Sequence, residues 1–376
     1  MDLVAIIILL GIVQGLFLGT LLISRKTGNK RANRILGLVF YNVSISMLYY
    51  FFYSTNLFLK YPHLQKTTFP TIFLYGPLIY FYSKVQTDSS FKIRGKQLLH
   101  FIPFVLVIIS NIPFYLQNAQ YKLDFFLQKG IIKNELAAIQ SISQIIQISI
   151  YIVITKILIN RHTQKIKNSV SLIDKVSLRW LSTSFNYFFS IFGLVAAHLI
   201  LIYFGVDLSS IYHITIPVFI TIFIYVIGYH GLKQPEIIIQ PEEIGNDKKY
   251  ERSTLTDEKS GEYLNNLLDL MENQKPYLQN DLTLLKLSEQ LCISTHHLSQ
   301  IINEKLNMNF YDFVNKYRVD EAKLLLLDPA KNSLTIFAIA VEAGFNSKSA
   351  FNSCFKKFTN ITPSEYKKHN LTSQAE

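Results

Sequence analysis

Two histidines and three glutamines lie inside long apolar segments, where polar side chains are costly and mark candidate functional positions. His198 and His213 fall near the facing ends of two apolar runs that a short connection joins, so the two imidazoles could meet. Such a pair can bind protons or a metal ion, while two neutral histidines hydrogen-bonded in a helical bundle are the alternative. Gln140, Gln144 and Gln147 share one helical face, which favours hydrogen bonds between helices over ligand contact. These five residues are the candidate sensing positions.

The acidic residues and cysteines argue against catalysis. The acids before residue 231 all lie in expected loops or at segment ends: Asp2, Asp88, Asp124, Glu135, Asp174 and Asp207. A transporter or a membrane enzyme is expected to place acids or a nucleophile at mid-depth in the bilayer. Cys292 and Cys354 have no metal-ligand spacing, so we predict reduced thiols and neither a metal nor a cofactor. We therefore expect that the chain is not an enzyme.

Seven apolar segments are long enough to cross a bilayer, which takes about 20 residues. They cover residues 3–23, 35–55, 69–86, 98–116, 136–159, 180–204 and 209–230. The third segment is the shortest and contains Pro70 and Pro77. Gly11, Gly15 and Gly19 lie on one face of the first segment, where packing inside the bundle is favoured over self-association.

The charge distribution predicts how these segments are oriented. Residues 1–230 hold 20 Lys and Arg against 6 Asp and Glu, residues 231–275 hold 6 against 10, and residues 276–376 hold 11 against 10. The positive excess therefore belongs to the apolar half, where it reports membrane topology. The first, third and fifth loops, counted together with Lys84 at the end of the third segment, hold 14 basic residues and the other three hold five. Because basic loops stay in the cytoplasm, we expect the N-terminus outside and, after seven crossings, the C-terminus inside.

A linker and one helix separate the two halves. Residues 231–251 contain Pro235, Pro241 and Gly245 among mixed charges, which is typical of a linker. Apolar residues at helical spacing then predict a helix over residues 256–273. The apolar face of this helix is too short for stable pairing with a second copy of the chain. We therefore expect the helix to dock onto the domain that follows.

The last hundred residues carry one helical pattern twice. Residues 284–291 and 295–305 have the apolar spacing of two helices that meet across a tight turn, with Ser294 as the N-cap of the second. This is the pattern of a helix-turn-helix. It returns over residues 336–355 at an offset of 53, with Gly344 in the turn.

Two further signals complete the repeat. Residues 315–327 have a helix-forming composition and would set the separation of the two units. Thr362 and Glu365 have the spacing of a capping box, with Pro363 at the first helical position. Two such units in tandem are a far more specific signal than one.

The resemblance rests on five stretches: Asp281–Leu284, Tyr317–Leu325, Ala343–Phe345, Phe355–Phe358 and Thr362–Tyr366. Through them, residues 277–369 resemble the DNA-binding domain of AraC/XylS-family transcription regulators. The whole arrangement is similar to the seven-span, membrane-bound, AraC-tailed regulators of bacteria, and the exit at residues 228–236 resembles theirs.

The resemblance implies an all-α fold, with a seven-helix transmembrane bundle followed by a soluble AraC-type domain of two helix-turn-helix subdomains. The expected domains are a seven-span sensor over residues 1–230, a cytoplasmic linker and connector helix over 231–275, the DNA-binding domain over 276–370 and a tail over 371–376. The expected location is the bacterial inner membrane, with the C-terminal domain in the cytoplasm.

The resemblance also implies two recognition helices in successive major grooves, about one DNA turn apart. The candidates for base contacts are His296, Ser299, Gln300 and Asn303 on the first helix and Ser349, Asn352 and Ser353 on the second. Lys348, Lys356 and Lys357 are the candidates for phosphates, which position a protein without reading sequence. The family often has arginine where Gln300 and Ser353 stand, so strong guanine contacts are not expected there. A near-neutral domain also predicts weak nonspecific affinity.

The expected function is a one-component transcription regulator that senses a cue through its bundle and binds promoter DNA sequence-specifically. Its expected partners are double-stranded DNA, the lipid bilayer, a small-molecule or membrane cue and, as a homodimer, a second copy of the chain. One alternative is a membrane receptor or scaffold whose helical tail docks a cytosolic protein. Another is that the second repeat mainly supports the first.

Overall fold

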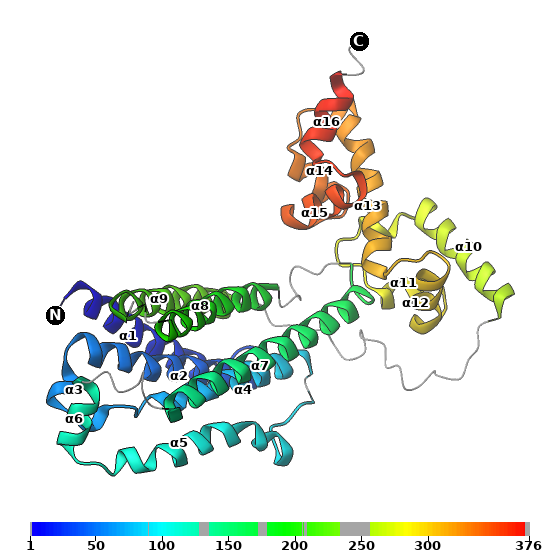
Figure 1. Cartoon of the computed structure of the whole chain (residues 1–376). Helices are drawn as coiled ribbons and strands as arrows, with labels where there is room; N and C mark the ends of the chain where they lie inside the picture. Colours follow the sequence, from blue (N-terminus) through cyan, green and yellow to red (C-terminus); the bar gives the residue numbers. More distant parts are fainter. Residues whose placement is uncertain are drawn as a thin grey trace. The chain divides into compact units, whose positions relative to one another are not determined.

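The computed structural model describes residues 2–88, 90–127, 135–171, 179–204, 206, 209–233 and 256–372. Within these ranges the regular secondary structure is helical apart from one isolated β-bridge between Val170 and Thr283, as predicted for an all-α protein. The chain divides into two compact units (Figure 1): residues 1–160 with 178–236, and residues 161–177 with 237–376. Most of the predicted linker (234–251) lies outside the described residues, as do residues 252–255, Asp174, Lys175, Asp207 and residues 373–376.

Each of the seven predicted apolar segments contains a helix in the N-terminal unit. The long helices are α1 (Leu3–Ser24), α2 (Lys30–Ser54), α4 (Tyr75–Thr87), α5 (Ile102–Tyr115), α7 (Glu135–Lys167), α8 (Arg179–Tyr203) and α9 (Ser209–Lys233). Short elements join them: α3 (Leu57–Lys60), α6 (Ala119–Leu127) and the 3-10 helices η1 (Pro62–Leu64), η2 (Phe69–Leu74) and η3 (Gly95–Phe101). Five helical stretches of the described residues are long and apolar enough to cross a membrane: Leu3–Ser24, Lys30–Ser54, Gly95–Tyr115, Ile139–Lys167 and Ile211–Leu232.

The third predicted segment is not one continuous α-helix. It begins as the 3-10 helix η2, with Pro70 in its first turn, and becomes α-helical at Tyr75. Pro77 has no amide hydrogen and therefore cannot bond the carbonyl four residues earlier, that of Phe73. The side-chain amide of Gln147 on α7 donates to this carbonyl at 3.2 Å. The Gln147 side chain thus satisfies a backbone carbonyl that the proline leaves without its usual helical donor.

The glycine face of α1 packs inside the bundle, as predicted. A Cβ atom on Gly15 would lie 2.2 Å from Ser44 Oγ, and one on Gly19 would lie 2.7 Å from the Tyr41 ring, both on α2. A Cβ atom on Gly11 would lie 2.5 Å from Thr221 Oγ1 on α9. The glycines therefore permit close approach of α1 to two neighbouring helices.

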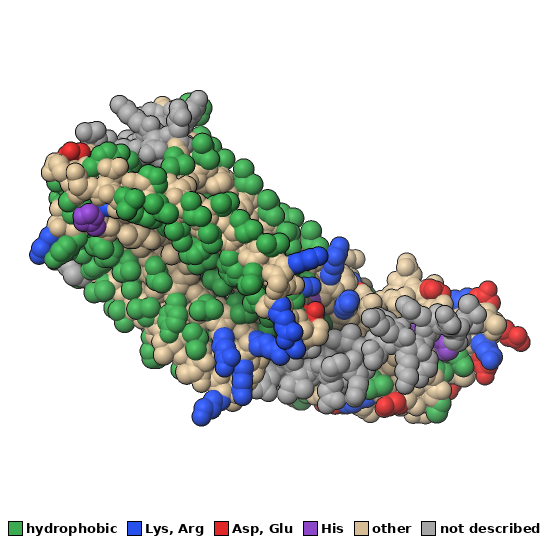
Figure 2. Space-filling view, turned by 90° about the horizontal axis from the view of Figure 1, so that it is seen from below, with side chains coloured by type: hydrophobic (Ala, Val, Ile, Leu, Met, Phe, Trp, Pro, Cys, Tyr) green, Lys and Arg blue, Asp and Glu red, His purple; other side chains and the backbone are tan. Residues whose placement is uncertain are grey.

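The outside of the N-terminal unit is apolar. Figure 2 shows hydrophobic side chains covering much of one face, with Lys and Arg side chains gathered toward one end. On α1 alone the exposed residues include Leu10, Val13 and Phe17, and α5 and α7 expose similar rows. An exposed apolar surface of this extent is typical of a protein–protein or membrane interaction surface.

The C-terminal unit is built on one helix, α13 (Phe310–Leu327). Before it come α10 (Asp257–Asn273), the 3-10 helix η4 (Pro276–Leu278), α11 (Leu284–Gln290) and α12 (Thr295–Glu304). After it come η5 (Pro329–Lys331), α14 (Ile336–Glu342), α15 (Lys348–Thr359) and α16 (Pro363–Thr372). In Figure 1 the first group surrounds one end of α13 and the second group surrounds the other.

Each group has its own hydrophobic core, and α13 contributes to both. Phe310, Phe313 and Val314 belong to the first core, together with Leu284, Leu287, Leu298, Ile301 and Ile302. Val319, Ala322 and Leu326 belong to the second core, together with Ile339, Phe345, Phe351, Cys354 and Phe355. The helix begins at Phe310, five residues before the predicted start, because Asn309 caps it by accepting a hydrogen bond from the Asp312 amide at 2.9 Å.

Candidate nucleic-acid interface

The first predicted recognition helix is α12, and its two sides differ in character. The Ser294 hydroxyl caps it by accepting from the His297 amide at 3.1 Å, as predicted. Leu298, Ile301 and Ile302 are buried in the first core. Of the four candidate residues on this helix, His296 and Asn303 are exposed and Ser299 and Gln300 are half-buried.

Three of these candidates, Ser299, Gln300 and Asn303, take part in hydrogen bonds within their own helix. The Gln300 side-chain amide donates to Glu304 Oε2 at 3.1 Å. The Asn303 amide donates to the Ser299 carbonyl at 2.8 Å and is 3.2 Å from the Ser299 hydroxyl. These contacts hold the amides against the helix, so binding a base edge would exchange an intrahelical bond for one to DNA.

The second predicted recognition helix is α15, with the same layout and more positive charge. Ser347 caps it by accepting from the Ala350 amide at 3.1 Å, and Phe351, Cys354 and Phe355 face the second core. On the other faces, Asn352 is half-buried and the remaining candidates are exposed: Lys348, Ser349, Ser353, Lys356 and Lys357. The Ser349 hydroxyl lies 3.3 Å from that of Ser347.

Charge is divided unequally between the two helices. The range of α12 contains no Lys or Arg, and Lys305 at its end pairs with Asp257 at 2.9 Å, which lowers the pKa of that carboxyl. On α15, Lys357 pairs with Asp312 of α13 at 2.6 Å. Within the described chain, this leaves Lys348 and Lys356 as the recognition-helix lysines without an ion pair. The arrangement suits amide and hydroxyl contacts from α12 and phosphate contacts from α15.

The turns of the two units use the same backbone geometry with different residues. Gly344 has a φ of +91°, and Cys292 in the first turn has a φ of +54°. A Cβ on Gly344 would lie 2.4 Å from the Tyr277 carbonyl oxygen and 3.0 Å from Arg318 Nε. The predicted turn glycine therefore has a second role. Because it has no side chain, the turn of the second helix-turn-helix can lie close to Tyr277 and Arg318.

The ends of the recognition helices repeat as well. Asn307 and Asn360 both have a positive φ, and Asn309 and Thr362 then cap the helices that follow. The predicted capping box is present: the Thr362 amide donates to Glu365 Oε2 at 2.7 Å, and the Glu365 amide donates to Thr362 Oγ1 at 3.3 Å. The hydrogen bonds that the Thr362 amide and hydroxyl donate to the Glu365 carboxylate lower its pKa.

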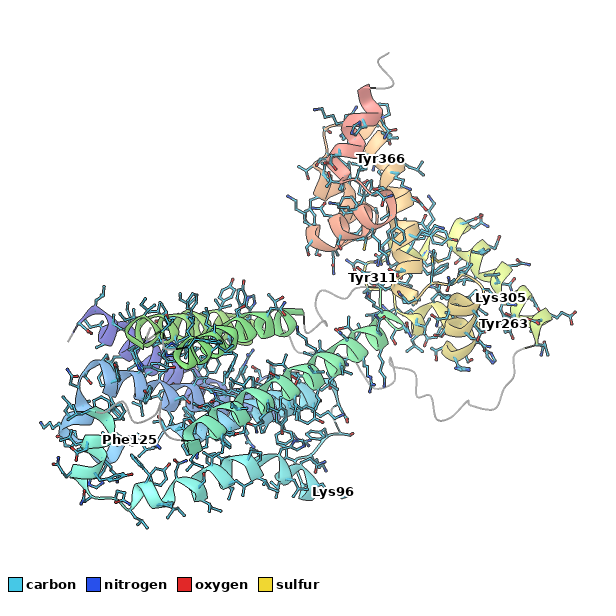
Figure 3. All side chains as sticks on the ribbon, viewed as in Figure 1. Lys96, Phe125, Tyr263, Lys305, Tyr311 and Tyr366 are labelled. Atoms are coloured by element: carbon cyan, nitrogen blue, oxygen red, sulfur yellow. The ribbon has the colours of Figure 1, made fainter. Side chains whose placement is uncertain are left out.

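The connector helix α10 docks onto the first helix-turn-helix unit, as predicted. Leu267, Leu270 and Met271 are buried in the first core. The Tyr263 ring stacks on His297 of α12, with centroids 6.3 Å apart. Figure 3 shows Tyr263 and Lys305 close together where α10 passes α12. The pose of α12 is thus held by the helix that directly follows the linker.

The glutamines on α7 make contacts between helices. The Gln140 amide donates to Ser110 Oγ on α5 at 2.9 Å, and Gln147 bonds the Phe73 carbonyl. Gln144, on the same helix, is also buried. The contacts of Gln140 and Gln147 agree with the predicted hydrogen bonding between helices.

The two histidines are surrounded by tyrosines that the sequence did not single out. His213 stacks on Tyr53 of α2 with centroids 3.7 Å apart, and His198 stacks on Tyr212 with centroids 4.2 Å apart. Tyr212 also contacts the His213 ring edge-on at 5.4 Å, and its hydroxyl is 3.3 Å from that of Tyr50. Tyr212 therefore contacts both imidazoles.

Arg318 is the structural residue that the sequence analysis missed. It is fully buried, and its Nε donates to the Tyr277 carbonyl at 2.7 Å and its Nη2 to the Gln279 carbonyl at 2.8 Å. Burial lowers its pKa to about 10, so the guanidinium stays charged at neutral pH. A signal was present, since Val314, Arg318 and Ala322 recur every fourth residue on one face of a helix.

Comparison with known proteins supports the assignment of this region. The family model HTH_18, described as a helix-turn-helix domain, matches residues 287–369. The C-terminal unit contains an AraC-type helix-turn-helix domain. An uncharacterized HTH-type transcriptional regulator of Staphylococcus aureus (strain COL) is 36% identical over 116 residues, which are 31% of this chain and 14% of that protein. One from Haemophilus influenzae is 30% identical over 90 residues, covering 24% of this chain and 29% of that one.

Two solved structures are also similar in sequence to part of the chain. A protein of unknown function from Listeria innocua is 28% identical and covers 28% of this chain and 94% of that chain, with a TM-score of 0.25. The C-terminal domain of the response regulator yesN from Fusobacterium nucleatum is 34% identical and covers 27% and 98%, with a TM-score of 0.24.

The matched relatives and the matched domain are helix-turn-helix transcription regulators and not enzymes. Together they support a DNA-binding regulator. The chain spans only about a seventh of the length of the Staphylococcus relatives, at 14%. The similarity to them therefore concerns the DNA-binding region.

Proposed function

We propose that the chain is a membrane-bound one-component transcription regulator. Its N-terminal unit crosses the membrane and perceives a cue, and its C-terminal unit binds promoter DNA sequence-specifically through α12 and α15. The observation that carries the proposal is the pair of helix-turn-helix cores on a single helix, α13, each with a capped second helix whose polar residues face away from the core.

The membrane part of the proposal rests on the apolar outer surface and on loop charge. Five described helical stretches have the length and composition of membrane spans. The basic loops predict that the C-terminus is cytoplasmic when seven segments cross. We place the sensing role in this unit, with His198, His213, Gln140, Gln144 and Gln147 as its candidate residues.

The DNA part assigns different tasks to the two helices. His296, Ser299, Gln300 and Asn303 would contact base edges, as would Ser349, Asn352 and Ser353. Lys348, Lys356 and Lys357 would contact phosphates, Lys357 only after its pairing with Asp312 is exchanged. The lysines on α15 favour an active second unit over one that only supports the first.

The test combines membrane fractionation with chromatin immunoprecipitation of the tagged full-length protein. We expect sharp promoter peaks from a protein that fractionates with the membrane. The variant Gln300→Ala with Asn352→Ala should lose these peaks, because each amide contact to a base is worth about 1–3 kcal/mol and the pair roughly a hundredfold in affinity.

A matched control removes the same two side-chain types from other surfaces. Gln290 at the end of α11 and Asn332 after η5 are both exposed, and their double alanine variant should keep the wild-type peaks. Unchanged occupancy in the Gln300 and Asn352 variant would overturn the site assignment. A stably inserted protein with no peaks would favour a receptor whose helical tail docks a cytosolic protein.

A further inference from the structure

The end of α7 and the described residues just beyond it, 168–171, belong to the C-terminal unit. Residues 161–177 cluster with residues 237–376, although the sequence pattern placed them in a loop between two membrane segments. Ser169, Val170 and Ser171 are all buried. Three small or polar residues of an interspan loop would be exposed if the loop only connected two helices.

These residues pair with the segment before α11 as a short antiparallel strand. The Ser171 amide donates to the Leu282 carbonyl at 3.4 Å, and the Leu284 amide donates to the Ser169 carbonyl at 2.9 Å. Between these bonds, Val170 faces Thr283 as an antiparallel bridge. Leu284 is the first residue of α11, so its amide has no partner within the helix. The interspan segment therefore supplies a hydrogen bond that the first helix-turn-helix lacks by itself.

Ser171 also completes the surroundings of Arg318. Its hydroxyl donates to the Leu282 carbonyl at 2.6 Å and accepts from Arg318 Nη2 at 3.2 Å. Its carbonyl accepts from Arg318 Nη1 at 3.4 Å and from the Asn315 amide at 3.3 Å. The other acceptors described around Arg318 are the carbonyls of Tyr277 and Gln279 and the amide oxygen of Asn315, which are also neutral.

Removal of the segment would leave a buried guanidinium with fewer acceptors. An ionised group in the protein interior is tolerated only when its donors are hydrogen-bonded. Arg318 lies between the part of α13 in the first core and the part in the second. It also lies beside Gly344, in the turn of the second unit. A change at Ser171 therefore alters the hydrogen bonding of Arg318, at the position where the two helix-turn-helix units meet.

We propose that residues 169–171 are a docking strand that couples α7 to the DNA-binding unit. The docking surface consists of Leu282, Thr283, Leu284, Asn315 and Arg318, and its occupant is the chain's own interspan segment. One residue, Asn168, separates the strand from the end of α7 at Lys167. A rotation or axial shift of α7 therefore acts on Ser171 and Arg318, and through α13 on the relation between α12 and α15. This regulatory consequence rests on the proposed function, whereas the docking itself does not.

Cross-linking tests the docking in the full-length protein in its membranes. Val170 and Thr283 form the non-hydrogen-bonded type of antiparallel pair, whose Cα atoms are about 4.5 Å apart and suit a disulfide. In a Cys292→Ser background, we expect Val170→Cys with Thr283→Cys to form an intramolecular disulfide under mild oxidation, detected by mass spectrometry. The two single-cysteine variants are the controls. A double variant that stays reduced, although both thiols react once the protein is denatured, would overturn the docking.

Two serine variants test the hydroxyl contact. Ser171→Ala removes the bonds to Leu282 and Arg318, whereas Ser169→Ala removes only a local bond to the Lys165 carbonyl at 3.3 Å. Hydrogen exchange of the Leu284 amide should become roughly tenfold faster in Ser171→Ala, as expected for loss of a hydrogen bond to a charged group, and stay near wild type in Ser169→Ala. Equal exchange in the two variants would contradict the role of Ser171.

DNA binding then separates a coupling strand from a merely structural one. Recovery of promoter fragments with full-length Ser171→Ala should differ several-fold from that with Ser169→Ala. Equal recovery, with the disulfide and the exchange difference both present, would overturn the regulatory role and leave the docking intact. If the wild-type protein recovers no DNA at all, the proposed function fails, and the cross-link and exchange results still decide the docking.

Discussion

Replacing Gly344 with alanine should destabilise the C-terminal unit strongly, because the new methyl group has no space and the backbone is unfavourable for it. At a φ of +91° an L-residue is strained, and the left-handed region costs roughly 1–2 kcal/mol. The Cβ atom would also lie 2.4 Å from the Tyr277 carbonyl oxygen, which is too close for that oxygen to remain in place.

The displaced oxygen is the one that accepts from Arg318 Nε at 2.7 Å. A hydrogen bond from a charged donor is worth about 1.5–3 kcal/mol. Adding the backbone strain gives a loss of about 3–5 kcal/mol, a large part of the roughly 5–15 kcal/mol that stabilises a typical domain. For a unit of this size the melting temperature should fall by roughly 12–20 °C.

Alkylation of Cys354 provides a local assay in the full-length protein. Cys354 is buried in the second core, so in a Cys292→Ser background its reaction with a maleimide on heating reports unfolding of that core. Gly261→Ala is the matched control, because a Cβ there meets nothing within 4 Å and the residue lies inside α10. This variant should gain up to about 1 kcal/mol from helix propensity. A melting temperature for Gly344→Ala within about 3 °C of wild type would refute the reasoning.

Two further predictions concern charge and thiol reactivity. Lys348→Gln should reduce the steepness of the plot of log DNA-binding constant against log salt concentration by about 0.9. Lys357→Gln should change this slope less, because Lys357 pairs with Asp312 at 2.6 Å. Filter binding between 50 and 200 mM salt measures both slopes, and equal slopes for the two variants would contradict the assignment. Cys292 is exposed and should react with maleimide in the native protein. Cys354 should react only after unfolding, because it is buried and burial raises its thiol pKa. Similar alkylation rates of the two thiols, measured by mass spectrometry, would argue against the second core as described.

Local signals in the sequence predicted much of the C-terminal unit. The Ser294 cap, the Thr362 and Glu365 capping box and the glycine in the second turn each depend on residues within four positions of one another. Docking of α10 followed from an apolar stripe too short to pair alone. Such features are readable because the residues that cause them are adjacent in the chain.

The features that the sequence did not reveal depend on contacts between distant residues. Ser171 bonds a carbonyl 111 residues later, and a three-residue segment has no periodicity that could predict a partner. Lys357 was a candidate for phosphate contact, but it pairs with Asp312, 45 residues earlier in the chain. The short connection between α8 and α9 predicted that His198 and His213 lie near each other. It could not predict that Tyr53 stacks on His213, because Tyr53 comes from α2.

The ion pairs have a consequence for how the proposed regulator would find its site. Residues 276–376 carry 11 basic and 10 acidic side chains, and Lys357 is occupied by Asp312. Few phosphate contacts mean little counterion release, and therefore weak sequence-independent binding to DNA. A protein held in a bilayer cannot follow DNA through the cell, so weak nonspecific binding costs it little, and two DNA-binding units on one helix raise the effective concentration of the second once the first is bound. We therefore expect the geometry that fixes the two helix-turn-helix units relative to each other, around Arg318 and Gly344, to influence the affinity for DNA.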